Sequence, residues 1–236
     1  MELRLSEGDT RNHLFWSDLG ISRLRQWSLE HCVAIPSINV DHFKLGGLTH
    51  RNQQERETNI SILMRIIERS KSLEIERILI PLFDHAEIHV NEDAAILRSS
   101  LEVPLKYAAE MNVELCLETT LPAHKNLFLF QPVWEVPLRF YYDIGNSAAF
   151  GFNLDEELKQ LGPWISGVHI KDRVFMGGNV PIGEGSVNFR KSFRGLLNLP
   201  YRGPWVLETT PGDSPNKFAK RHISFTINLL EEITGV

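Results

Sequence analysis

The sequence contains few cysteines, no long apolar run and no excess of positive charge. Cys32 and Cys116 are its only two cysteines in 236 residues, so we expect no disulfide framework and favour a reducing, cytoplasmic setting. The first residues have no apolar signal core, and no stretch of about 18 uncharged apolar residues is present, which argues against secretion and membrane spanning. The net charge of −5 argues against nucleic-acid binding, because phosphates must be neutralised by a basic face.

The glycine-rich motifs of nucleotide-binding proteins are missing as well. The first apolar run is followed by Ser6-Glu7-Gly8-Asp9 instead of the glycine-rich turn that opens a dinucleotide-binding sheet. There is no GxxxxGK[ST] loop either. Because no linker or low-complexity tract divides the chain, we predict a single domain over residues 1–236.

Short apolar runs predict β-strands, and amphipathic segments between them predict helices. Several runs show little alternation, as expected of parallel strands that are covered on both faces. The helical pattern is clearest in Arg51–Leu73, Ala94–Met111 and Phe218–Ile233. The predicted strands are Glu2–Leu5, Cys32–Val40, Arg77–Phe83, Val113–Glu118, Phe140–Ile144, Ser166–Ile170 and Trp205–Glu208.

Alternating strands and helices in a chain of this length are typical of a doubly wound open sheet or of a (β/α)8 barrel. A barrel carries its reactive residues at the C-terminal ends of many strands, because its active site is built on that face. Polar, reactive side chains follow most of the predicted strands. We therefore predict an α/β protein of the (β/α)8 TIM-barrel type.

Three carboxylates and one imidazole stand at four strand ends: Glu118, Asp143, His169 and Glu208. The strand ends of a barrel converge on one mouth, so these side chains can face one point. Three carboxylates at one point repel one another unless a cation compensates them. The pattern predicts a divalent metal site, for which Mn²⁺ fits the mixed donor set best and Co²⁺, Mg²⁺ or Zn²⁺ are alternatives.

Other residues near strand ends are weaker candidates for a site. The pairs Asp41-His42 and Asp84-His85 lie where loops begin. Aromatic residues and a cysteine within the strands are predicted to pack in the core: Phe140, Tyr141, Tyr142 and Cys116.

Five segments together resemble a known family. LCLETT, YYDIGN, GVHIKDR, VPIGEGSVNF and WVLETT occur in this order and look like segments of the sugar-phosphate isomerase/epimerase branch of the xylose-isomerase-like TIM barrels. Within that branch, the sequence is most similar to the L-ribulose/L-xylulose 5-phosphate 3-epimerase type. The resemblance extends from about Glu2 to Glu208.

The resemblance implies roles for individual residues. The four metal ligands would be Glu118, Asp143, His169 and Glu208, and the two glutamates would also be the acid/base pair on opposite faces of the substrate. Glu184 would border the same mouth in the turn Gly183-Glu184-Gly185. The expected substrate-binding residues are His42, Asn146, Lys171, Arg173 and Glu184.

Such a site predicts proton transfer on a keto-sugar or sugar phosphate. A divalent ion on the carbonyl and an adjacent hydroxyl would stabilise an enediolate after a carboxylate removes the proton. Return of the proton on the other face epimerises the carbon, and return to the neighbouring carbon isomerises the sugar. A polyol dehydratase of the same barrel family and a non-catalytic, metal-binding truncated barrel remain as alternatives, whereas the negative charge disfavours a related DNA-repair endonuclease.

One departure from the family concerns its first strand. Family barrels carry a further strand and helix before the segment that Glu2–Leu5 resembles, so we count seven strands here and not eight. A missing strand would expose a barrel edge, and exposed edges favour association between chains. The alternatives are an open or incomplete barrel, a first strand supplied by another chain, and a truncated sequence, and an exposed edge would favour a homo-oligomer. The resemblance implies a small-molecule sugar as the partner, whereas the charge and the lack of a long apolar run argue against nucleic acid and membrane.

Overall fold

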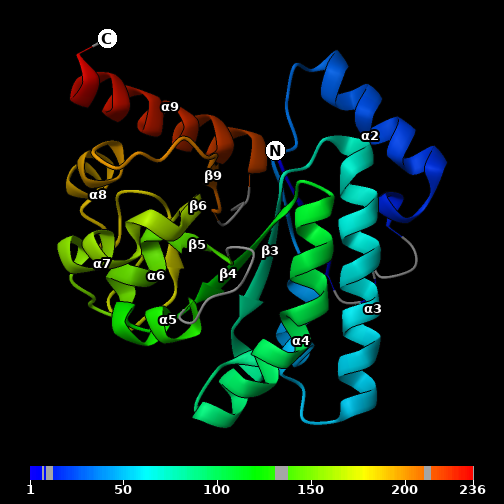
Figure 1. Cartoon of the computed structure of the whole chain (residues 1–236). Helices are drawn as coiled ribbons and strands as arrows, with labels where there is room; N and C mark the ends of the chain where they lie inside the picture. The colour runs from blue at the N-terminus through cyan, green and yellow to red at the C-terminus, as the bar shows by residue number, and fades with distance from the viewer. Residues whose placement is uncertain (7, 9–12, 131–137, 210–213, 236) are drawn as a thin grey trace. The chain divides into compact units, whose positions relative to one another are not determined.

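The computed structural model describes residues 1–6, 8, 13–130, 138–209 and 214–235. The chain falls into two compact units, which Figure 1 shows in the colour order of the sequence. The first unit comprises Met1–Thr119 and Phe128–Arg139, and the second comprises Thr120–Leu127 and Phe140–Val236. The single domain expected over residues 1–236 stays a prediction.

Parallel strands form the sheet of the first unit. They are β1 (Glu2–Arg4), β2 (Ser37–Asn39), β3 (Arg77–Leu82) and β4 (Glu114–Thr119), and they pair in this order. One row of the sheet joins Leu3, Ile38, Ile78 and Leu115, all of them buried. Burial continues along nearly all of β3, which explains why its sequence does not alternate.

The long helices of the first unit are α2 (Asp18–Glu30), α3 (Gln53–Ser70) and α4 (Asn91–Glu110). Helices α3 and α4 pack side by side (Figure 1). Helix α4 begins earlier than predicted because the carboxylate of Asp93 accepts the N–H groups of His89 and Val90 and so caps its first turn. Short 3-10 helices complete the unit: η1 (Leu14–Trp16), η2 (Asp41–Leu45), η3 (Gly47–Thr49), η4 (Lys71–Leu73) and η5 (Asp84–Ala86).

Three further parallel strands belong to the second unit, except for Arg139, the first residue of β5, which belongs to the first unit. In the order of pairing they are β5 (Arg139–Asp143), β6 (Ile165–Ile170) and β9 (Trp205–Leu207). Directly after β6, the chain forms a short antiparallel hairpin of β7 (Asp172–Arg173) and β8 (Asn179–Val180). With the strands of the first unit, these give the seven parallel strands predicted from the sequence, and that prediction is confirmed.

Helices of the second unit follow its strands: α6 (Ile144–Ala149), α7 (Leu154–Leu161), η6 (Gly162–Trp164), α8 (Phe189–Leu197) and α9 (Pro215–Thr234). Helix α5 (Ala123–Phe130) precedes β5 and has residues in both units. Helix α8 packs against α7 and α9. Helix α9 begins before the predicted Phe218, because Pro215 fits the first turn of a helix. Within the described residues, no helix has the length and apolar character needed to cross a membrane.

The strand expected over Cys32–Val40 is shorter in the structure and covers Ser37–Asn39 alone. Cys32 has a positive φ of 50° directly after α2, a backbone conformation that does not fit a strand. Its side chain is exposed, whereas Cys116 is buried as predicted. The packing predicted for the β5 aromatics is also confirmed, because Phe140, Tyr141 and Tyr142 are all buried.

Candidate metal centre

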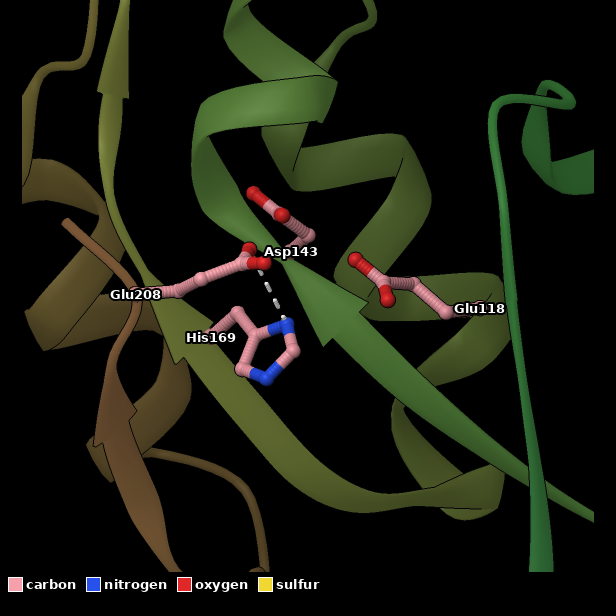
Figure 2. Close-up of side chains that lie close together, drawn as sticks. All are labelled: Glu118, Asp143, His169 and Glu208. Atoms are coloured by element: carbon pink, nitrogen blue, oxygen red, sulfur yellow. Dashed lines mark ion pairs between the residues drawn. The ribbon is translucent and has the colours of Figure 1, made fainter. Parts of the chain in front are cut away.

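The second unit brings three of the predicted strand-end residues together. Asp143 is the last residue of β5, and it lies opposite His169 of β6 in the parallel register. Glu208 directly follows β9, and its N–H donates to the carbonyl of Ile170 at 3.1 Å. Because the strands are parallel and adjacent, their C-terminal ends carry these side chains to the same edge of the sheet (Figure 2).

The donor atoms of these three residues lie close together, and two of the three side chains are buried. Each of Asp143, His169 and Glu208 offers one ligand atom, and these three atoms lie within 4.8 Å of one another. His169 Nδ1 lies 3.4 Å from Glu208 Oε2. The His169 side chain is fully buried, the Asp143 side chain is nearly so, and about a third of the Glu208 side chain is exposed. The exposed glutamate is therefore the part of the cluster that solvent reaches.

Local structure fixes the orientation of Asp143. Its Oδ1 accepts the N–H groups of Gly145 at 2.8 Å and Asn146 at 2.9 Å, which caps the start of α6. Burial alone would raise the pKa of Asp143, but the positive charges of Lys171 and His169 and the Asn146 N–H outweigh burial and hold that pKa below its usual range. Asp143 is therefore a carboxylate at neutral pH.

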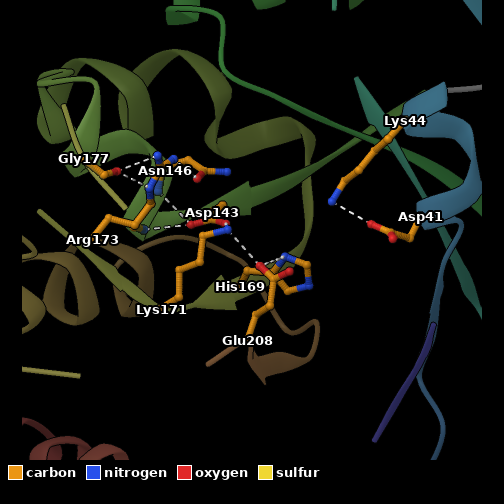
Figure 3. A network of polar contacts seen from close by, with 10 residues as sticks. Asp41, Lys44, Asp143, Asn146, His169, Lys171, Arg173, Gly177 and Glu208 are labelled. Carbon is orange, nitrogen blue, oxygen red and sulfur yellow. Dashed lines mark hydrogen bonds and ion pairs between the residues drawn. The ribbon is translucent and has the colours of Figure 1, made fainter. Parts of the chain in front are cut away.

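Lys171 supplies the cation of the cluster. It follows His169 by two residues, so both side chains leave an extended strand on the same face. Its Nζ lies 2.6 Å from Asp143 Oδ2 and 2.9 Å from Glu208 Oε2 (Figure 3). A Cβ on residue 145 would lie 2.5 Å from Lys171 Cγ, so Gly145 leaves the space that the lysine stem occupies. Lys171 was predicted from the sequence as a substrate contact, but its ion pairs with Asp143 and Glu208 were not predicted.

Arg173 and Asn146 lie beside this cluster. Arg173 Nη1 donates to Asn146 Oδ1 at 2.8 Å, and Arg173 Nη2 and Nε donate to the carbonyl of Gly177 at 2.7 and 3.1 Å (Figure 3). The guanidinium also lies over the Phe150 ring, 5.7 Å from its centroid. The predicted substrate residues Asn146, Lys171 and Arg173 thus share one neighbourhood within the second unit.

Other predicted residues lie in the first unit. Glu118 is the penultimate residue of β4 and is 2% exposed. His42 is half-buried at the start of η2, and its N–H donates to the carbonyl of Leu5. Its neighbour Asp41 pairs with Lys44 at 2.6 Å (Figure 3) and with Arg4 at 2.7 Å. Asp84 and His85 are exposed in η5.

Glu184 lies in the second unit but has an ion-pair partner on a helix. Its exposed carboxylate pairs with Arg221 of α9 at 2.9 Å. The substrate contact suggested for Glu184 stays a prediction.

The side chains present in the second unit fit a divalent metal ion. Asp143 and Glu208 offer carboxylate oxygens and His169 offers an imidazole nitrogen, a mixed set that suits ions such as Mn²⁺, Zn²⁺ or Mg²⁺. The Lys171 ammonium already contacts both carboxylates, so their oxygens converge on a positive charge. This acidic and histidine cluster could hold a divalent metal.

Known proteins share the sequence pattern and the fold. The sequence model of the family described as xylose isomerase-like TIM barrel matches residues 1–229. The chain is 27% identical to the L-ribulose-5-phosphate 3-epimerase UlaE of Escherichia coli O1:K1, over 88% of this chain and 76% of that protein. The solved structure of a xylose isomerase domain protein from Planctomyces limnophilus superimposes with a TM-score of 0.82 at 18% identity, over 100% of this chain and 89% of that chain.

A second solved structure carries a metal ion. It is a xylose isomerase-like TIM barrel protein from Mycobacterium smegmatis in complex with magnesium, with a TM-score of 0.73 and 17% identity over 93% of this chain and 80% of that chain. At such identities the structural likeness concerns the fold. The TIM-barrel class and the family resemblance predicted from the sequence are confirmed.

Proposed function

Because this chain belongs to the xylose isomerase-like TIM barrel family, we propose that it is a divalent-metal-dependent isomerase or epimerase of a keto-sugar or sugar phosphate. The observation that carries the proposal is the cluster of Asp143, His169 and Glu208, which combines two carboxylates and an imidazole at the ends of three neighbouring strands. Family membership alone would leave the reaction open, because one barrel fold serves many chemistries.

The proposed ligand set has Glu118 as a fourth member. Glu118 is a buried carboxylate near the end of a parallel strand, which is where a barrel carries its functional side chains. Its addition gives three carboxylates and one imidazole, for which Mn²⁺ is the best-matched ion. Mg²⁺ is the first alternative, because a family neighbour of known structure contains it.

Protein groups perform the proton transfer in this proposal. When bound, the divalent ion stabilises the negative charge that develops as the substrate forms an enediolate. One of Glu118 and Glu208 removes the proton next to the substrate carbonyl, and the other returns a proton to the opposite face. The Lys171 ammonium lies 2.9 Å from Glu208 Oε2 and therefore holds the Glu208 carboxylate in place beside Asp143 and His169.

The proposed substrate class is a five-carbon keto-sugar phosphate. The relative UlaE is named for L-ribulose 5-phosphate, and it spans most of this chain. Arg173 and Lys171 offer charged N–H donors beside the cluster, and such donors suit phosphate or hydroxyl oxygens. Because the proton returns on the opposite face, the proposed reaction is an epimerisation. The name of the relative UlaE suggests carbon 3 as the carbon that is inverted.

Solvent deuterium exchange tests the proposal. The protein is stripped of metal with EDTA, loaded separately with Mn²⁺, Mg²⁺, Co²⁺ or Zn²⁺, and incubated in deuterium oxide with L-ribulose 5-phosphate, L-xylulose 5-phosphate and the unphosphorylated sugars. We expect the epimer of a phosphorylated pentulose, with deuterium at the inverted carbon, in the presence of metal only. Deuterium at the neighbouring carbon of an aldose would indicate isomerisation instead.

Matched variants separate the active site from trace contamination. Glu208→Gln and Glu118→Gln are expected to lose turnover while keeping the fold, and Glu232→Gln, which alters an exposed partner of Arg190, is expected to keep it. A product lighter by one water would replace the proposal with a dehydratase. If no sugar takes up deuterium with any of the four metals, the catalytic proposal is wrong and a metal-binding role takes its place.

A further inference from the structure

Asp172 is a buried carboxylate that the proposed reaction does not use. It lies between Lys171 and Arg173, and 1% of its surface is exposed. Neighbouring residues of an extended segment point to opposite faces. The Asp172 side chain therefore leaves the backbone on the face opposite to the two cationic side chains that reach the metal cluster and its surroundings.

Four backbone N–H groups donate to the Asp172 carboxylate. Oδ2 accepts from Gly183 at 2.9 Å and Gly185 at 2.8 Å, and Oδ1 accepts from Val187 at 3.1 Å and from Arg173 at 3.0 Å. Hydrogen bonds to an ionised acceptor are about twice as strong as neutral ones. The segment 183–187 is thereby fixed to the strand residue that precedes Arg173.

The close approach of the 183–187 segment to Asp172 depends on Gly185. A Cβ on residue 185 would lie 2.3 Å from Asp172 Oδ1 and 2.6 Å from the carbonyl oxygen of Arg173, so only Gly185 fits this contact. The next residue, Ser186, donates its N–H to the same Arg173 carbonyl at 2.8 Å, and its Oγ accepts the N–H of Phe175. Both backbone polar groups of Arg173 are therefore held by the contacts of Asp172 and the 183–187 segment.

The fixed backbone of Arg173 sets the position from which its side chain extends. Its guanidinium reaches Asn146 on α6 and the Gly177 carbonyl in the hairpin that begins with Asp172. A long side chain that is held at its base loses fewer conformations when it makes such contacts. The orientation of the guanidinium follows from the backbone that Asp172 holds.

We propose that Asp172 is a positioning residue for the site: by binding the N–H groups of Gly183, Gly185, Val187 and Arg173, its carboxylate holds the Arg173 guanidinium against Asn146, where it binds substrate. This inference rests on the proposed function for its effect on turnover. The position of the guanidinium can be observed without any activity.

The direct test is a crystal structure of Asp172→Asn. An asparagine offers one acceptor oxygen, and its NH₂ group would face N–H donors of the 183–187 segment. We expect this segment to move away and the Arg173 guanidinium to leave Asn146. Faster amide hydrogen exchange at Gly183 and Gly185 should accompany the change. An unchanged contact between Arg173 and Asn146 in the variant would overturn the inference, whether or not the protein is an epimerase.

The kinetic test is a double-mutant cycle with Arg173→Ala. Loss of a group that orients a ligand-binding side chain typically costs about 10–100-fold in activity or affinity, so Asp172→Asn should lower kcat/KM by that factor in the wild-type background, mainly through KM. In the Arg173→Ala background it should lower kcat/KM by less than about 3-fold, because the residue through which it acts is gone. A purely structural role predicts equal losses in both backgrounds, and that result would overturn the inference.

Two further variants serve as a control and as a replacement if Asp172→Asn does not fold. Asp155→Asn makes the same chemical change in an exposed ion pair with Lys191 and should leave kinetics unchanged. If Asp172→Asn does not fold, Gly185→Ala displaces the same segment through its Cβ and should release Arg173 in the same two measurements. A wild type without activity on any sugar contradicts the proposed function, while the crystal structure of the variant still decides the positioning role.

Discussion

Glu157 provides a quantitative test of the buried polar contacts in the second unit. It lies in α7 with 4% of its surface exposed, and the hydroxyl groups of Tyr142 and Ser147 both donate to its Oε2. Burial raises its pKa, and the two hydroxyl donors offset only part of that effect. Among the described residues, no cationic group contributes to this pKa.

The sign of the pH dependence follows from the raised pKa. In the unfolded chain a glutamate titrates near pH 4.3, so above that pH the unfolded state loses a proton that the folded state still holds. The free energy of unfolding then falls by about 1.4 kcal/mol per pH unit until the folded-state pKa is reached, and it is level above that pH. Glu157→Gln removes the titration, and its amide oxygen can still accept from both hydroxyls.

Urea unfolding with EDTA present, at several pH values between 4 and 8, measures this contribution. The stability of Glu157→Gln relative to the wild type should rise with pH from about pH 4.3, by as much as about 1.4 kcal/mol per unit, and then level off. At the acid end the variant should be less stable by about 1–3 kcal/mol if its new NH₂ group finds no acceptor.

Glu232→Gln is the matched control. Its hydrogen bond with Arg190 lowers the pKa of Glu232, so the contribution of this carboxylate to stability is present at neutral pH and is lost as pH falls. The relative stability of that variant should therefore change with pH in the opposite direction. A pH-independent difference between Glu157→Gln and the wild type would refute the reasoning, because it would mean that burial does not raise the Glu157 pKa.

Three further predictions concern the site and the core. Glu208→Gln should lower kcat by at least about 100-fold with an unchanged circular dichroism spectrum, and a wild-type rate would remove Glu208 from the mechanism. Asp143→Asn should weaken Mn²⁺ binding in isothermal titration calorimetry by at least about 10-fold, whereas wild-type affinity would exclude Asp143 as a ligand. Ile78→Ala, in the fully buried row of the first unit, should lower the free energy of unfolding by about 2–5 kcal/mol in urea titrations, and a loss below about 1 kcal/mol would contradict the packing described.

Strand positions were predictable because their signal is local. Continuous apolar runs mark β3, β5 and β6, and the polar residue that ends each run is read directly from the sequence. The helix over Arg51–Leu73 was predicted by its three- and four-residue periodicity. The strand predicted to begin at Cys32 was wrong there, because apolar neighbours in the sequence do not reveal that Cys32 has a positive φ.

The sequence by itself determined the seven strands and placed Asp143, His169 and Glu208 at strand ends, because apolar runs and the polar residues that end them depend on neighbours along the chain. Tertiary structure decided which groups those residues contact. The ion pairs of Lys171 with Asp143 and Glu208 require strands that are distant in sequence to pair in one register. The four N–H donors of Asp172 require the chain to turn back through Gly183 and Gly185. Such contacts arise from the path of the folded backbone, which no local pattern of residue types encodes.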